Sequence, residues 1–324
     1  MLHAVNSIGE LSHSPDVFPT VIHNDAQVEN LDESVVWIQR NFESLRRELD
    51  SSGALVFRGF PVTDAQGYDR FFQAFEFGNF TYRESLSNAV RIHHTPTVIT
   101  ANAATKDEEI YLHSEMAQTP IYPSVISLFC QAAAEQGGAT VLCRSDRVYD
   151  ELLAMEPELT GQLEALGIRY TTRMPESDAR ESGQGRSWKG TLSVTTVAEA
   201  EAKLKELNYA WRWEDDGALL AQTPPLPAVR ELADGRKSFF NQIVAAYLGW
   251  AGARENPGSV LCFGDDSAIP SAFMERIVEV ALDHSYDLQW QDGDVAVVNN
   301  HLVMHGRKPY SGDRKRVVLV ALGR

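Results

Sequence analysis

Two short segments, far apart in the chain, carry the pattern that most constrains this protein. The first contains His113-Ser114-Glu115, and the second runs from Gly293-Asp294 to His305-Gly306-Arg307. Side chains two residues apart on an extended segment point to the same side, so one strand would direct His113 and Glu115 toward one ion. With His305 arriving from a second strand, the pattern predicts a metal site with three protein ligands on one face and open positions on the other.

Further residues in a fixed order accompany both segments. A Gly137-Gly138-Ala139-Thr140 turn follows the first, while Asn300 and Arg316 flank the second histidine. A His-x-Glu triplet alone arises often by chance, but the presence of these further residues in this order makes a metal site a more specific prediction. His301 lies four residues before His305 and competes with it as a ligand. Two histidines and one carboxylate are the ligand set typical of non-haem iron(II) oxygenases.

These motifs, in this order, resemble the taurine and 2,4-D dioxygenase (TauD/TfdA) family of Fe(II)/2-oxoglutarate-dependent oxygenases. Within it, the chain is similar to the branch of tailoring hydroxylases that includes the syringomycin-pathway enzyme. The resemblance runs from Leu55-Val56-Phe57-Arg58-Gly59-Phe60 through Phe239-Phe240-Asn241-Gln242 to Arg316-Val317-Val318-Leu319. It implies a double-stranded β-helix (jelly-roll) core, the cofactor Fe(II), the co-substrates 2-oxoglutarate and O2, and release of succinate and carbon dioxide.

The resemblance also assigns the ligands. It implies that His113, Glu115 and His305 bind the metal, and it favours His305 over His301 because Gly306-Arg307 completes the His-Gly-Arg pattern of the family. Related halogenases carry a small residue in place of the carboxylate, which leaves a coordination position for chloride. Glu115 keeps that position filled, so hydroxylation is expected rather than halogenation.

An arginine is expected to hold the distal carboxylate of 2-oxoglutarate, because its planar, permanently charged fork pairs with a carboxylate through two hydrogen bonds. The family spacing of eleven residues after the second histidine leads to Arg316. Arg314 is the alternative, and a separation of two residues would place both on the same face of a strand. Thr140 matches the family threonine that contacts the same carboxylate, although a β-branched residue also simply suits a strand.

Other polar positions are expected around these groups. Asp294 and Asn300 are predicted to shape the turn and support the ligands. Several residues match positions where the family contacts substrate, and for each of them ordinary packing or solvation is the alternative: the run with Arg91, His93 and His94, then Asn102, Trp188, Lys189, Asn241 and Arg307.

The chain is expected to be mainly β with flanking helices, forming one domain over residues 1–324. Apolar spacing predicts helices over 33–50 and 64–75, with an aromatic stripe in the second that belongs to the core. Strands are predicted over 54–60, 124–131, 140–143, 286–290, 295–299 and 317–322, and a helix begins after Pro270. Residues 172–236 turn polar, glycine-rich and then helical, which predicts a lid-like insertion.

Charge and cysteine usage bear on partners and compartment. A net charge of −16 disfavours nucleic acid and anionic membranes as partners. The sequence lacks a long apolar run and a secretory signal, and its three cysteines form no paired motif, so a cytoplasmic protein is expected.

The expected activity is hydroxylation of an unactivated carbon in a small amino-acid-like or carboxylated metabolite of secondary metabolism. The substrate is either free or tethered to a carrier protein, and homo-oligomerisation stays open. Desaturation or cyclisation by the same chemistry is the nearest alternative. A jelly-roll metal-binding protein or isomerase without 2-oxoglutarate is the alternative from another class, against which the combination of His113, Glu115, His305 and Arg316 argues.

Overall fold

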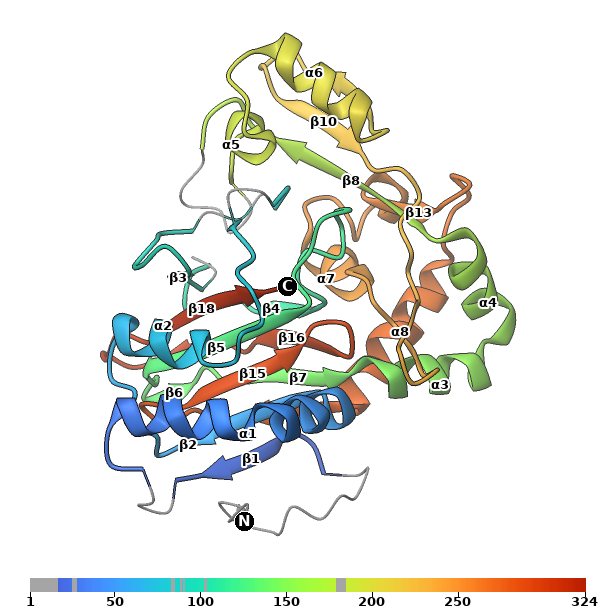
Figure 1. Ribbon diagram of the computed structural model, residues 1–324. Helices are drawn as coiled ribbons and strands as arrows, with labels where there is room; N and C mark the ends of the chain where they lie inside the picture. Colours follow the sequence, from blue (N-terminus) through green and yellow to red (C-terminus); the bar gives the residue numbers. More distant parts are fainter. Residues whose placement is uncertain are drawn as a thin grey trace.

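The computed structural model describes residues 17–24, 28–82, 85–87, 89, 91–101, 104–178 and 185–324. Two sheets face each other in the larger part of the molecule (Figure 1). The first has six strands, in the order β1 (Thr20–His23), β2 (Ala54–Arg58), β15 (Val295–Asn299), β5 (Val125–Ala132), β18 (Val317–Gly323) and β3 (Val98–Thr100). The opposing sheet, called the four-stranded sheet from here on, has its strands in the order β14 (Ser285–Leu288), β7 (Thr140–Arg144), β16 (Val303–Arg307) and β4 (Ile110–His113).

The space between these sheets is filled by aliphatic side chains that alternate along the strands. Strand β15 is buried along Val295–Val298, and its Ala296 and Val298 turn toward the inside of the sandwich, where they join Leu128 of β5 and Leu142 of β7. Opposed sheets with such a core form the expected jelly roll, and the structure confirms the predicted strands at 54–60, 124–131, 140–143, 295–299 and 317–322.

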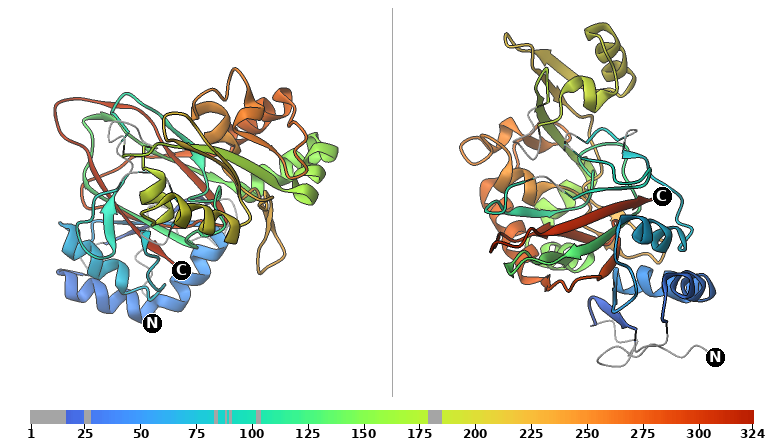
Figure 2. Two further views of the ribbon diagram at one scale, coloured as in Figure 1. Left: turned by 90° about the horizontal axis from the view of Figure 1, so that it is seen from above. Right: turned by 90° about the vertical axis from the view of Figure 1, so that its left-hand side faces the viewer.

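Helices α1 (Leu31–Ser52) and α2 (Ala65–Gln73) cover the outer face of the six-stranded sheet (Figure 2). Helix α1 begins at the Asn30 cap and ends at Gly53, whose φ of 90° suits glycine. The aromatic stripe of α2 is buried against the sheet, which confirms its predicted place in the core: Tyr68, Phe71, Phe72 and Phe75.

A third cluster of apolar residues lies beside the four-stranded sheet. It is enclosed by helices α3 (Ser145–Met155), α4 (Pro157–Leu166), α7 (Ile243–Gly249) and α8 (Ser271–Asp283). Helix α8 follows Pro270 as predicted. Helices α3, α4 and α7 were not predicted, because their apolar residues merge with those of the neighbouring strands.

A further sheet, called the second sheet from here on, stands above the sandwich in Figure 1. Its strands are in the order β13 (Leu261–Phe263), β8 (Ile168–Met174), β10 (Leu219–Gln222) and β9 (Ala210–Trp213). Helices α5 (Trp188–Leu192) and α6 (Val197–Glu206) pack on it around a small core of their own. The predicted capping box of Thr196 and Glu199 opens α6. Residues 172–236 supply most of this second sheet, which begins earlier, at Ile168, and also takes in β13.

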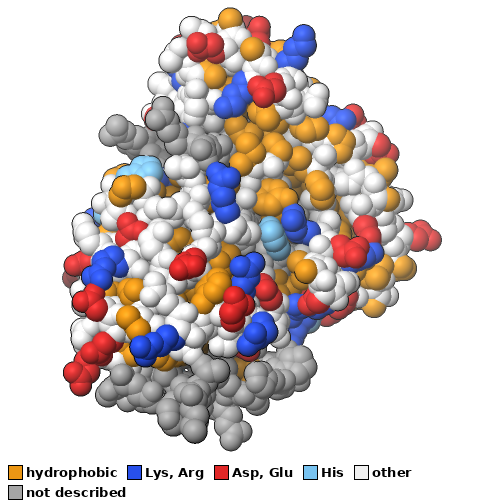
Figure 3. Space-filling model, in the orientation of Figure 1, with side chains coloured by type: hydrophobic (Ala, Val, Ile, Leu, Met, Phe, Trp, Pro, Cys, Tyr) orange, Lys and Arg blue, Asp and Glu red, His pale blue; other side chains and the backbone are white. Residues whose placement is uncertain are grey.

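Short elements connect these parts: β6 (Gln136–Gly137) with β17 (Tyr310–Ser311), the hairpin β11 (Arg230–Glu231) and β12 (Lys237–Ser238), and the 3-10 helix η2 (Pro257–Ser259). Hydrophobic side chains gather on the face seen in Figure 3, where the second sheet meets the sandwich. Among the described residues, no helix has both the length and the apolar character needed to cross a membrane.

Candidate metal centre

Three side chains converge near the ends of two paired strands of the four-stranded sheet. His305 of β16 lies opposite His113 of β4 in the antiparallel ladder. Oε2 of Glu115 lies 3.8 Å from Nε2 of His113 and 3.5 Å from Nε2 of His305. Neighbouring ligands of one ion with bonds of about 2.1 Å are separated by about 3 Å. The three donors, all within 4.8 Å of one another, therefore suit a single metal ion after a small contraction.

Glu115 reaches this site from a loop, not from a strand. Strand β4 ends at His113, so the expectation that one strand delivers both ligands was wrong. The chain turns sharply after Glu115, since Met116 has a φ of 60°. Left-handed backbone at a residue other than glycine is costly and is retained where the surroundings impose it.

Asn300 imposes this loop conformation on the ligand. Its Oδ1 accepts a hydrogen bond from the Glu115 amide at 2.7 Å, and its Nδ2 donates to the Glu115 carbonyl at 3.0 Å. The same Nδ2 donates to the carbonyl of Pro123 at 2.7 Å. The side chain of Asn300 thus satisfies both backbone groups of a buried ligand residue, in keeping with its predicted supporting role.

A second brace comes from the segment before α7. The Ser114 amide donates to the Asn241 carbonyl at 3.1 Å, and Nε2 of Gln242 donates to the Ser114 carbonyl at 3.2 Å. The side chain of Asn241 is itself engaged with backbone, since its Nδ2 donates to Ala228 and its Oδ1 accepts from Ile243.

The protonation states suit metal binding. Nδ1 of His113 lies 2.8 Å from the Tyr111 carbonyl, to which it donates, so Nε2 carries the free lone pair. Burial, together with the neighbouring His113, lowers the pKa of His305 and favours its neutral imidazole. Burial alone would raise the pKa of Glu115, but the two neighbouring imidazoles and the charge of Arg91 hold this pKa well below its usual range.

Gly306 permits the close approach of the two ligand strands. A Cβ on this residue would lie 2.5 Å from the Ile110 carbonyl oxygen, which is closer than a Cβ comes to a non-bonded atom in a folded protein. A side chain here would push β16 away from β4 and separate His305 from His113. Close packing of β16 against β4 thus explains why a glycine stands in the His-Gly-Arg motif.

The triad opens into a cavity whose empty volume is about 510 Å³, counting its mouth. The lining includes both guanidinium groups Arg91 and Arg316, the hydroxyl of Thr140, and aliphatic residues of the sandwich interior. A cation pair beside a metal-ligand set is suited to a substrate that carries carboxylates.

Arg316 and Arg314, which the sequence left as alternatives, have different surroundings. Arg314 is exposed and pairs with Asp292 at the surface. Arg316 lines the cavity, where its Nε donates to the Gly138 carbonyl at 3.1 Å. Both precede β18, which begins at Val317, so neither follows the alternation of a strand.

Gly138 makes room for the arginine of the cavity. Its φ is 70°, and a Cβ on it would lie 3.0 Å from Nε of Arg316. Burial, together with the nearby charge of Arg307, lowers the pKa of Arg316, so its charge lacks full compensation from the described protein groups. Thr140 follows the glycine pair, and its Oγ1 accepts from Nε1 of Trp290 at 2.9 Å, which leaves the hydroxyl hydrogen free to point into the cavity.

His301 lies outside the triad. Its ring packs against Tyr122 and Phe240, with ring centroids 5.9 and 5.4 Å away. Burial lowers its pKa to about 4, with a smaller contribution from Arg230. The histidine that the structure brings to His113 and Glu115 is His305.

Asp294 shapes the turn before β15, as predicted. Its carboxylate pairs with Arg58 of β2 at 2.6 Å and accepts from the Gln291 amide at 2.9 Å. This partly buried pair ties two motifs of the sequence, the Arg58-Gly59 end of β2 and the Gly293-Asp294 turn, to each other.

The residues expected at the substrate have varied surroundings. Asn102 lies outside the described residues. Trp188 packs in the core of the second sheet, with its ring centroid 5.1 Å from that of Trp213. Arg307 donates to the carbonyls of Ala104, Thr105 and Glu108 at 2.6 to 3.1 Å. The contacts of Trp188, Asn241 and Arg307 are with the protein itself, and their part in substrate binding stays a prediction.

From the sequence, Arg91 was expected only in a run near substrate, and its place against the metal ligand Glu115 was not foreseen. Its side chain is 8% exposed and lies beside Glu115, whereas the adjoining His93 and His94 are exposed. No spacing rule links Arg91 to the ligand motif. The available signal was a lone arginine in a short apolar strand-like run.

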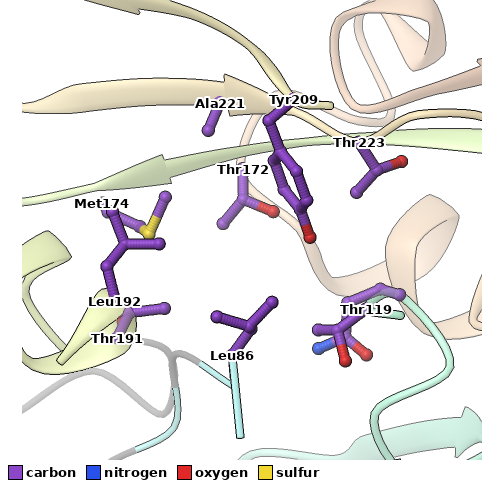
Figure 4. A pocket seen from close by; sticks show the side chains of 10 residues that line it. Leu86, Thr119, Thr172, Met174, Thr191, Leu192, Tyr209, Ala221 and Thr223 are labelled. Carbon is purple, nitrogen blue, oxygen red and sulfur yellow. The ribbon is translucent and has the colours of Figure 1, made fainter. Parts of the chain in front are cut away.

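A second cavity lies between the second sheet and the loop that follows Glu115 (Figure 4). Tyr209, next to β9 of the second sheet, points into this cavity, and Thr119 lies on its opposite side. Gln118, which precedes Thr119 in the loop after Glu115, also lines it. Among the described residues, its lining includes four threonines and apolar side chains but no charged side chain: Leu86, Gln118, Thr119, Thr172, Met174, Thr191, Leu192, Tyr209, Ala221 and Thr223. Oε1 of Gln118 is buried without a hydrogen-bond partner in the described chain.

Comparison with known proteins places this geometry in a family. The model of the family described as taurine catabolism dioxygenase TauD, TfdA family matches residues 20–322. A clavaminate synthase-like protein of Arabidopsis thaliana is 33% identical over 275 residues, which cover 85% of this chain and 82% of the relative. The dapdiamide synthesis protein DdaC of Enterobacter agglomerans is 26% identical over 285 residues, covering 84% and 83%.

The fold is shared with solved oxygenases. The structure of asparagine oxygenase with Fe(II), 2S,3S-3-hydroxyasparagine and succinate superimposes with a TM-score of 0.54. The sequences are 11% identical, and the match covers 90% of this chain and 83% of the other. At this identity the likeness concerns the fold alone.

Proposed function

The chain belongs to the TauD/TfdA family of Fe(II)/2-oxoglutarate-dependent dioxygenases, and from this premise we propose that it hydroxylates a small amino-acid-like or carboxylated metabolite at an unactivated carbon. The observation that carries the proposal is the convergence of His113, Glu115, His305 and Arg316 on one cavity. A binding protein or isomerase with no use for 2-oxoglutarate has no need of that arginine beside a metal-ligand set.

The ligand residues would hold Fe(II) through Nε2 of both histidines and a carboxylate oxygen of Glu115. Three ligands on one face leave the opposite face open to the co-substrates. When bound there, Fe(II) with 2-oxoglutarate and O2 supplies the oxidising power that inserts oxygen into a carbon–hydrogen bond. The protein's part is to fix the ligand rotamers, through the Tyr111 carbonyl at His113 and through Asn300 at Glu115.

Arg316 and Thr140 would bind the distal carboxylate of 2-oxoglutarate. Arg316 donates a hydrogen bond to the Gly138 carbonyl through its Nε, so both terminal nitrogens of its fork can face a carboxylate. The Thr140 hydroxyl receives a hydrogen bond from Trp290 and can donate its own to the same group. Bound in this way, 2-oxoglutarate would have its keto acid end toward the triad.

An amino-acid-like substrate is supported by the named relatives. One of them takes part in dapdiamide synthesis. Secondary metabolism is proposed on the same ground. Glu115 fills the position that halogenases of this chemistry leave to chloride, which supports hydroxylation over halogenation.

We also propose that residues 172–236 form a lid-like insertion within a single domain over 1–324. The second cavity supports this, because Met174, Thr191 and Tyr209 of the insertion line it together with Thr119, which follows the ligand Glu115 in the chain (Figure 4). Such a space is suited to the uncharged, hydrogen-bonding part of a substrate.

The proposal extends to partner and compartment. A small-molecule substrate follows from the family. A substrate tethered to a carrier protein would enter the cavity of the metal centre through the mouth of that cavity. The acidic balance of the chain argues against nucleic acid, and three free, buried cysteines support a reducing cytoplasm. A homo-oligomer is compatible with the fold.

The test begins with anaerobic protein, Fe(II) and 2-oxoglutarate, whose joint binding is followed by the visible charge-transfer band of the complex. Free amino acids, their amides and carrier-tethered forms are then screened for substrate-coupled release of succinate. Coupled release with a product heavier by one oxygen supports the proposal. A complete absence of the band, with metal bound, would contradict it.

A further inference from the structure

A buried arginine lies against the carboxylate ligand of the proposed metal centre. Nη2 of Arg91 is 3.7 Å from Oε1 of Glu115, and both side chains are 8% exposed. Arg91 lines the same cavity as the three ligands. It is the partner of Glu115 on the side away from the histidines.

The two oxygens of Glu115 have different neighbours. Oε2 faces Nε2 of His113 at 3.8 Å and Nε2 of His305 at 3.5 Å, whereas Oε1 faces Arg91. We propose that Arg91 is a positioning residue that holds Oε1, so that Glu115 offers the metal Oε2 alone. This inference rests on the proposed metal centre.

Arg91 is itself held from behind. Its Nη1 donates to the Thr100 carbonyl at 3.3 Å, and its guanidinium carbon lies 5.8 Å from the centre of the Tyr82 ring. The Tyr82 hydroxyl is fixed in turn, donating to the Ala89 carbonyl at 2.6 Å. A guanidinium supported on its outer side can hold a carboxylate oxygen in place.

The consequence concerns the number of open positions on the metal. A carboxylate that binds through one oxygen, together with two histidines, leaves three positions of an octahedral ion open. A carboxylate that binds through both oxygens leaves two, too few for the two oxygens of 2-oxoglutarate and for O2. Arg91 would therefore preserve the position that the third ligand of the reaction requires.

Simple charge repulsion predicts the opposite effect. A guanidinium near the site repels a divalent cation, so its removal would tighten metal binding. The positioning role predicts weaker binding, and only while Glu115 is present. The direction of the change and its dependence on Glu115 separate the two effects.

The experiment uses the full chain and Mn(II) alone as the probe. Metal affinity is measured by titration, and water-proton relaxation by bound Mn(II) counts the metal's water-filled positions. Arg91→Gln is compared with Arg91→Lys and with Arg186→Gln, after circular dichroism shows that each variant is folded. Arg186 is the matched control, because it also lies over the Tyr82 ring, at 5.4 Å, and donates to the Ser87 carbonyl.

Arg91→Gln should weaken Mn(II) binding about tenfold or more and lower the relaxation per bound ion by about a third, as three waters become two. Arg91→Lys should restore the relaxation, and Arg186→Gln should match the wild type. Added to Glu115→Ala, Arg91→Gln should cause no further loss of affinity. Unchanged or tighter binding by Arg91→Gln, or weaker binding with unchanged relaxation, overturns the inference. Equal affinity of wild type and Glu115→Ala instead overturns the proposed metal centre.

Discussion

Replacing Arg316 with alanine tests the proposed carboxylate site with a matched neighbour as control. The substitution removes a half-buried cation from a cavity in which its terminal nitrogens have no carboxylate partner in the described chain. Truncating one partner of a buried, hydrogen-bonded charge pair costs about 2–5 kcal/mol. Because Arg316 is only half-buried, we expect about 2–3 kcal/mol, which is roughly a 30- to 150-fold weaker affinity for 2-oxoglutarate at 1.4 kcal/mol per factor of ten.

Affinity for 2-oxoglutarate is measured on the anaerobic Fe(II) complex by titration of the visible band, with metal affinity measured separately. Arg316→Ala should leave metal affinity within about twofold, since the arginine touches none of the three ligands. Arg314→Ala should change neither affinity by more than about twofold, because an exposed pair such as Arg314 with Asp292 contributes about 0–1 kcal/mol. Arg316→Lys should recover part of the loss, because a point charge cannot reproduce the fork.

The reasoning is refuted if Arg314→Ala weakens 2-oxoglutarate binding and Arg316→Ala does not. Equal losses in both variants would show that the general positive charge near the mouth of the cavity matters more than a specific pair. A parallel loss of metal affinity in Arg316→Ala would place the arginine in the support of the ligands.

Three further changes have defined outcomes. His305→Ala should abolish turnover and weaken Fe(II) binding by at least about 100-fold, whereas His301→Ala should retain most of both in the same titrations; the reverse order would identify the wrong histidine as ligand. Asn300→Ala should lower the free energy of unfolding by about 2–4 kcal/mol in urea denaturation, because it orphans the buried amide and carbonyl of Glu115; an unchanged midpoint would contradict this. Glu115→Ala should lose hydroxylation, and the wild type given chloride should form only oxygenated or desaturated product by mass spectrometry; chlorinated product from the wild type would overturn the ligand assignment.

The central strands of the six-stranded sheet were predictable because their sequences are strongly patterned. The apolar runs around Leu55, Ile126 and Val297 match buried strands in the structure, and the Thr196 capping box opens a helix. The Gly137-Gly138 turn was recognisable in the same way, and both residues have the positive φ that favours glycine. Local chemistry was thus sufficient wherever one segment determines its own conformation.

Features that depend on distant segments were not predictable. Glu115 lies in a loop whose shape is imposed by Asn300 and by the segment around Asn241, neither of which is near it in sequence. Arg91 belongs to the site only because the fold brings it to Oε1 of Glu115. The second sheet pairs β8 with β13, almost a hundred residues later, so its extent could not be inferred from the polar composition of residues 172–236.

The central claim is that His113, Glu115 and His305 bind one Fe(II) while Arg316 holds 2-oxoglutarate beside it. The most direct test is a crystal structure of the protein grown anaerobically with Fe(II) and 2-oxoglutarate, with data collected at the iron absorption edge. The account predicts one anomalous peak about 2.1 Å from Nε2 of both histidines and from Oε2 of Glu115, with the distal carboxylate paired to Arg316. A peak coordinated by His301, or a distal carboxylate bound by Arg314 or Arg91, would contradict it.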